Sequence, residues 1–147
     1  MKKTIAIAAS FIGALSFNSY AGTGVIPSYH IWDGGGKSCF KVSNISSNSA
    51  IVTIKMFDKT GEYFSGTVAS NYIIPALDTP FTLEARKTAF FCMTSGEKNA
   101  PGYGIIEGQP LDASQGQISL VASGYYTNNA QNYAQAFSIV INGGMPF

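Results

Sequence analysis

Charged side chains are scarce in this sequence. Asp, Glu, Lys and Arg make up 12% of its 147 residues, about half of the usual share of about 25%. Apolar residues make up 46%, which is too many for a disordered chain. The surface must therefore be solubilised largely by Ser, Thr, Asn, Gln and Tyr. Because the few basic residues form no run or stripe, we expect no nucleic-acid binding.

Residues for the commonest catalytic sites are also missing. His30 is the one histidine, which excludes a metal site built from several histidines. No Gly-x-Ser-x-Gly turn is present to expose a serine nucleophile, and "GGGKS" at 34–38 has Ile31 where a phosphate-binding loop needs its first glycine. We therefore expect no cofactor, no metal and no enzymatic activity. A pair of carboxylates spaced for glycoside hydrolysis remains an open alternative.

Helical periodicity is absent after residue 21, and strand periodicity replaces it. Val52, Ile54 and Met56 alternate with Thr53 and Lys55, which is the pattern of a half-buried strand. β-rich runs occur at 38–45, 50–57, 62–68, 71–75, 81–85, 87–94, 102–108, 116–126 and 133–141. We expect about seven to eight strands from them. Their spacing predicts an all-β fold, either a single antiparallel two-sheet sandwich or one sheet closed on itself.

The "DKTG" stretch, Asp58 to Gly61, resembles the phosphorylated-aspartate motif of cation-pumping ATPases. A chain of 147 residues has no room for the nucleotide-binding and membrane domains of such a pump. The stretch also separates two β-rich runs. We therefore predict a tight turn, in which Asp58 bonds the local backbone and Gly61 takes a positive φ.

The first 21 residues predict an export signal. "MKK" is followed by the apolar run "TIAIAASFIGALSF" and by "SYA", which places small Ser19 and Ala21 at the positions that a signal peptidase inspects. The run is shorter than the roughly 20 residues that span a bilayer. We expect cleavage after Ala21 and a single domain over 22–147 without a membrane span. The expected location is the periplasm, the cell surface or the medium of a bacterium.

Only two cysteines are present, Cys39 and Cys92. An oxidising compartment favours a disulfide between them, and each lies in an expected strand. Strand parity argues the other way, because Phe40 and Val42 look inward and so send Cys39 outward, while the parity around Cys92 is ambiguous. We predict the disulfide, with two buried free thiols as the alternative.

Several motifs in order carry a resemblance to a known group. The series "FKVSNIS", "VTIKMFDKTGEYF", "GYGIIEG", "ISLVASGYY" and "FSIVINGGMPF" resembles small secreted bacterial proteins, largely uncharacterised, that are predicted to fold as immunoglobulin-like or fibronectin-like sandwiches. The similarity covers residues 39–147. It implies an immunoglobulin-like fold and an exported location, and it supplies no catalytic residues. The cysteine pair and the segment 61–81 lie outside the shared pattern.

These observations favour a non-enzymatic, exported sandwich that acts through surface contacts in adhesion, in a matrix or in envelope assembly. The segment Ser123 to Gln135 contains Tyr125, Tyr126 and Tyr133 and no charge. It can therefore offer flat apolar area without desolvating charges. We predict that it contacts a protein or a surface polysaccharide. The alternative is a hairpin tip whose tyrosines pack on their own sheet.

Two other functions are compatible with parts of the sequence. A small carbohydrate-binding module would stack sugars on Trp32, Tyr125, Tyr126 and Tyr133, although ordinary strand packing also explains such aromatics. A pilus-type subunit would be completed by a strand from its neighbour, and "GTGVIPSYHIW" at 22–32 is the one candidate for that strand. The sequence leaves the oligomeric state open.

Overall fold

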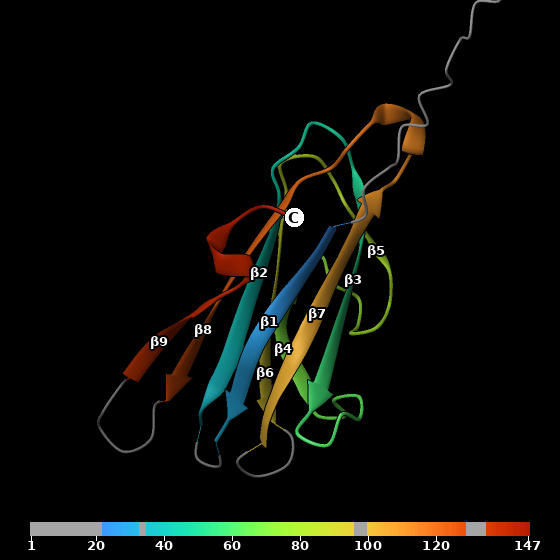
Figure 1. Cartoon of the computed structure of the whole chain (residues 1–147). Helices are drawn as coiled ribbons and strands as arrows, with labels where there is room; N and C mark the ends of the chain where they lie inside the picture. Colours follow the sequence, from blue (N-terminus) through green and yellow to red (C-terminus); the bar gives the residue numbers. More distant parts are fainter. Residues whose placement is uncertain (1–21, 33–34, 96–99, 129–134) are drawn as a thin grey trace, which may run out of the picture.

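The chain folds into two antiparallel β-sheets packed face to face (Figure 1). The structure is a computed structural model that describes residues 22–32, 35–95, 100–128 and 135–147. It confirms the predicted all-β sandwich, with nine strands in place of the expected seven to eight. Within these residues, no helix is long and apolar enough to cross a membrane. The predicted export signal lies outside the described residues.

The nine strands are short, and two 3-10 turns follow the seventh and ninth. The strands are β1 (Gly22–Ile31), β2 (Lys37–Asn44), β3 (Ala50–Asp58), β4 (Thr67–Tyr72), β5 (Phe81–Leu83), β6 (Thr88–Ser95), β7 (Ala100–Pro110), β8 (Leu120–Asn128) and β9 (Gln135–Val140), and the turns are η1 (Ala113–Gln115) and η2 (Asn142–Gly144).

One sheet has four strands in the order β1-β7-β3-β5. On β3 the side chains of Val52, Ile54 and Met56 are buried, and the residues between them are half-exposed. This confirms the period-2 pattern of the sequence. The alternation leaves one face of the sheet in the core and presents the other to solvent.

Glycines on the inward face of β7 leave room for core side chains from neighbouring elements. Gly104 and Gly108 point inward, where an added Cβ would overlap the sulfur of Met56 and the side chain of Leu120 respectively. The space that a β7 side chain would need is therefore filled by side chains of neighbouring elements. The inward face of β7 is largely glycine, while its outward face carries large and polar residues.

The other sheet has five strands in the order β4-β6-β2-β8-β9. Phe40 on β2 and Phe91 on β6 face the core, with ring centroids 5.3 Å apart. Cys39 and Cys92 are register partners on the same two strands and form a disulfide, with Cα atoms 4.0 Å apart. The predicted bridge is thus confirmed. Both cysteines lie on the outward side, so strand parity does not oppose the bond.

A buried asparagine ties the end of β2 to two loops. Asn44 is 1% exposed, and its Nδ2 donates to the carbonyl oxygens of Asn48 at 2.8 Å and Leu83 at 3.0 Å. Its Oδ1 accepts from the backbone N–H of Ser46 at 3.0 Å. The side chain thereby bonds these three backbone groups, and its contact with the Leu83 carbonyl is fully buried.

Three expectations about the strands are wrong in detail. Residues 22–32 were considered as a candidate donor strand for a neighbouring subunit, whereas residues 22–31 form β1 and pair with β7 of the same chain. A register shift between Ile26 and Tyr29 interrupts the alternation there, which hides the strand in the sequence. The run 62–68 makes only an isolated bridge at Tyr63 before β4 begins. The run 71–75 leaves the sheet at Ile73, whose φ is +73°.

Candidate binding surface

The solvent-facing side of β1, β7 and β3 combines packed aromatic rings, an ion pair and a shallow depression. We call it the β1–β7–β3 face. Three cross-strand rows define it, each containing a residue of the central strand β7. Glu107 lies between Thr23 and Thr53, Ile105 lies between Val25 and Lys55, and Tyr103 lies opposite Phe57. Ile51 and Gln109 form a further pair at one end. The face is therefore apolar and aromatic at one end and polar at the other.

Three aromatic rings gather at the apolar end. Phe57 and Tyr103 stack across β3 and β7 with centroids 5.0 Å apart and an interplanar angle of 20°. Tyr63 lies against the other side of Phe57, with centroids 5.0 Å apart. Tyr63 and Tyr103 are 54% and 40% exposed. Together the three rings form a closely packed row, here called the aromatic platform, in which Phe57 lies between two exposed tyrosines that carry hydroxyl groups.

The "DKTG" turn places Tyr63 in this platform. The Gly61 N–H donates to the Asp58 carbonyl at 3.1 Å, and Gly61 has a φ of +88°, as predicted for a turn. The Asp58 N–H then donates to the Glu62 carbonyl at 2.8 Å, which reverses the chain so that Tyr63 bridges back to Phe57. The turn thus has a structural role that also shapes the surface.

The carboxylate of Asp58 holds the turn in shape. Its Oδ1 accepts from the hydroxyl of Thr60 at 2.7 Å, from the Thr60 N–H at 2.8 Å and from the Glu62 N–H at 3.1 Å. The Thr60 hydroxyl contributes most to lowering the pKa of Asp58 below its ordinary value, and the backbone N–H groups add to the effect. The ionised form is therefore the one that the turn stabilises.

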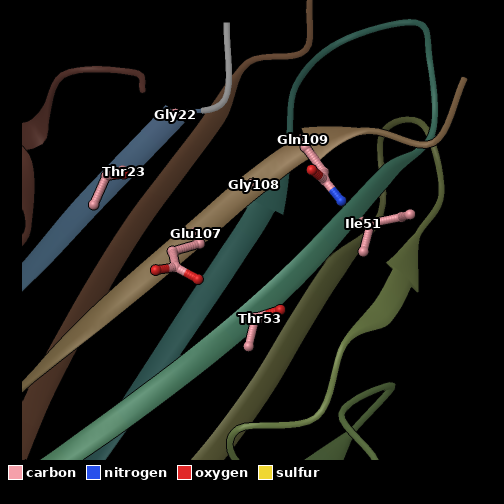
Figure 2. Close-up of a pocket in the computed structure, with 7 residues that line it drawn as sticks. All are labelled: Gly22, Thr23, Ile51, Thr53, Glu107, Gly108 and Gln109. Atoms are coloured by element: carbon pink, nitrogen blue, oxygen red, sulfur yellow. The ribbon is translucent and has the colours of Figure 1, made fainter. Parts of the chain in front are cut away.

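A shallow depression of about 290 Å³ lies at the polar end of the face. Figure 2 shows that its lining comes from β1, β7 and β3, with Glu107 and Gln109 on the central strand and Ile51 and Thr53 beside them. Enclosed small-molecule sites usually measure about 300–1,000 Å³ and bury most of their ligand. This depression is small and open, so it suits one unit of a larger ligand.

One ion pair crosses the middle of the face. Lys55 Nζ lies 2.9 Å from Glu107 Oε2 and 3.1 Å from Oε1. The hydrogen bond to Glu107 is the main cause of the raised pKa of Lys55. The pair is solvent-exposed, so it contributes little to stability. It instead fixes a positive and a negative hydrogen-bonding group between the aromatic platform and the depression.

The sequence-predicted partner residues lie elsewhere and do not share one face. Tyr126 lies 5.8 Å from the His30 ring and 6.4 Å from the Phe137 ring, and His30 lies 5.8 Å from Trp32, measured between centroids. Trp32 and Tyr126 thus each lie next to the His30 ring, which links them into one aromatic group. Tyr125 points to the opposite side of β8, because consecutive strand residues alternate. Tyr133 lies outside the described residues.

The platform residues were missed in the sequence, although a signal was present. Once Val52, Ile54 and Met56 are assigned to the core, period-2 alternation sends Phe57 outward. A similar argument applies to Tyr103, which follows a glycine on β7. The proximity of Tyr63 depends on the turn geometry, which alternation alone does not give.

Titratable residues do not gather into a metal centre in the described part of the chain. No group of three or more His, Cys, Asp or Glu side chains there is arranged to hold a metal ion. Comparisons with protein-family models, with curated proteins and with solved structures find no match to this chain. The functional argument therefore depends on the geometry of the surface itself.

Proposed function

We propose that the protein is a non-enzymatic, exported adhesion or matrix component that binds polysaccharide through its β1–β7–β3 face. The observation that carries the proposal is the aromatic platform of Phe57, Tyr63 and Tyr103, whose two tyrosines are 54% and 40% exposed. Solvent-exposed aromatic rings in contact leave apolar area uncovered, which is expected where a partner covers it.

The chemistry of the face matches a sugar chain. A pyranose ring has an apolar C–H side that packs on an aromatic ring, while its hydroxyl groups need hydrogen-bond partners in the plane of the ring. Tyrosine hydroxyls, the Glu107 carboxylate and the Gln109 amide supply such partners. Because the groups are spread along β7 from Tyr103 to Gln109, a polymer lying along the strand meets the platform and the depression in turn.

The acidic residues support binding in preference to hydrolysis. Most glycoside hydrolases use two carboxyl groups that flank the bond to be broken. Glu107 is the one carboxylate among the described residues that line the depression, and Lys55 occupies both of its oxygens. A carboxylate held in this way is suited to accepting hydrogen bonds from sugar hydroxyls.

The disulfide supports the exported location within this proposal. Cys39 and Cys92 are bonded, and such bonds persist in the periplasm and outside the cell, where thiols are not kept reduced. The signal-like residues 1–21 point to the same compartments. Polysaccharide is abundant at bacterial surfaces, so the location and the proposed ligand agree.

The proposal is tested by sedimenting the protein with insoluble cellulose, chitin and peptidoglycan and by titrating it with soluble glucans. We expect at least one polysaccharide to retain it. A Tyr63→Ser, Tyr103→Ser double variant should bind about tenfold or more weakly, because aromatic contacts are worth about 0.5–1.5 kcal/mol each and about 1.4 kcal/mol is tenfold in affinity.

Tyr126→Ser is the matched control, since it removes a tyrosine from the other aromatic group. It should leave binding unchanged. Melting temperatures are compared first, so that a loss of binding is not a loss of fold. If Tyr126→Ser abolishes binding while the double variant keeps it, the sequence-predicted surface is the true site. Failure of every polysaccharide to bind contradicts the proposed function.

A further inference from the structure

β9 lies at a free edge of the five-stranded sheet. It is the last strand in the order β4-β6-β2-β8-β9, and Figure 1 shows it at the margin of the molecule. Its pairing with β8 is continuous from Ser123 opposite Val140 to Asn128 opposite Gln135. A regular strand at an edge presents a straight row of backbone N–H and C=O groups on its other side.

The other three sheet edges carry features that hinder pairing. β1 has a register shift between Ile26 and Tyr29, where Pro27 lacks a backbone N–H. β5 is only three residues long. β4 has two register shifts in its pairing with β6, and Ser70 within it has a φ of +54°. Shortness, proline and bulges are the devices that natural proteins use to protect edges.

β9 has none of these devices. Its sequence "QAFSIV" contains no proline, no glycine and no charge, and residues 113–147 contain no Asp, Glu, Lys, Arg or His. Phe137 and Val140 are 57% and 59% exposed. They lie on opposite faces of the strand, so an added strand would find an apolar side chain beside it on each face.

We propose that β9 pairs with β9 of a second copy of this chain, in an antiparallel and two-fold symmetric manner. A second copy fits because pairing an uncharged strand with itself brings no like charges together, and a two-fold contact closes without further growth. Centring the pair on Ser138 places Phe137 opposite Ile139 and Ala136 opposite Val140 of the other copy. All four of these side chains are apolar.

This register determines the relative orientation of the two copies. In that register, residues opposite each other have the same parity, so the core faces of the two five-stranded sheets lie on one side of the joined sheet. The two four-stranded sheets then cover that same side. Both β1–β7–β3 faces therefore point in one direction. If the proposed function is correct, one polysaccharide surface can engage both faces, and the second contact adds avidity.

The test measures the mass of the purified protein in solution over a concentration series, by sedimentation velocity. A six-residue strand buries little area, so we expect a weak dimer that dissociates on dilution. Ser138→Lys places two like charges on the symmetry axis and should abolish the dimer. Thr82→Lys, at an exposed position on the edge strand β5, is the matched control and should leave the dimer intact.

A Ser138→Cys variant tests the register and does not depend on the lysine variant folding. With oxidised glutathione as the oxidant, the two introduced thiols on the axis should form an intermolecular disulfide, whereas Thr82→Cys should not cross-link. A monomer at all concentrations up to about 1 mM overturns the proposal, as do open oligomers larger than a dimer or a dimer that Ser138→Lys leaves unchanged. These readouts involve no sugar, so they fail or succeed separately from the proposed function.

Discussion

Phe57 and Tyr103 are direct register partners on β3 and β7, and their rings stack on the solvent side of the sheet with centroids 5.0 Å apart. Cross-strand aromatic pairs stabilise a sheet by about 0.2–1 kcal/mol. That gain does not require either ring to be exposed, and Tyr103 is 40% exposed. The pair therefore has area to offer a ligand as well as a role in the sheet.

The first prediction separates the ring of Tyr103 from its hydroxyl. Tyr103→Phe should keep most of the polysaccharide affinity, because the stacking area remains. Tyr103→Ser should lower affinity several-fold and the free energy of unfolding by less than about 1 kcal/mol. Titration calorimetry and urea unfolding measure the two effects. Equal affinity of the Ser and Phe variants would show that the ring does not contact the ligand.

The second prediction links the "DKTG" turn to the platform. Asp58→Asn should fold and bind almost normally, since an amide oxygen can still accept from Thr60 and Glu62. Gly61→Val should destabilise by about 1 kcal/mol or more, because a β-branched residue is strained at a φ of +88°. It should also weaken binding by displacing Tyr63. Greater damage from Asp58→Asn than from Gly61→Val, by thermal melting, would contradict the structural role of the turn.

Sequence patterning predicted the regular part of this fold and not its surface. The strand around Val52 was found because one buried face imposes a strict alternation, whereas the strand around Phe91 was found from its β-rich composition, since Phe91, Cys92 and Met93 are all buried and leave its parity ambiguous. β1 was not recognised as part of the sheet because its register shift breaks that alternation. Ile73 was assigned to a strand because its residue type favours strands and does not indicate its positive φ. Tyr63 joins Phe57 only through the turn, so the candidate site needed three-dimensional geometry.

The third prediction concerns the disulfide between β2 and β6. The bond joins residues 53 positions apart, so in the chain-entropy model it stabilises the fold by about 4 kcal/mol. The Cys39→Ala, Cys92→Ala double variant should lose stability of this order in urea unfolding. The intact mass of the parent protein should lie two hydrogen atoms below that of the dithiol. A stability loss well under 1 kcal/mol would show that the bond constrains little of the unfolded chain.

The fourth prediction concerns Asn44, which is buried at the end of β2 and connects it to two loops. Its Nδ2 donates to the carbonyls of Asn48 and Leu83, and its Oδ1 accepts from Ser46. Asn44→Ala removes these hydrogen bonds at a position that is 1% exposed and leaves the Asn48 carbonyl only the hydroxyl of Ser46, at 3.1 Å. A buried unsatisfied group costs about 1–3 kcal/mol, so a total loss of about 2–4 kcal/mol is expected in urea unfolding.

Asn44→Asp tests whether the hydrogen-bond donor is the essential part. A carboxylate has nearly the same shape and can still accept from Ser46, but it would place a negative charge against the carbonyl oxygens of Asn48 and Leu83, which need a donor. We therefore expect Asp to be at least as damaging as Ala, and to be less damaging at low pH, where the acid is protonated and can donate one hydrogen bond. An Asp variant as stable as the parent at pH 7 would mean that water enters the site, and the tie between β2 and the Leu83 loop would then be weaker than these distances indicate.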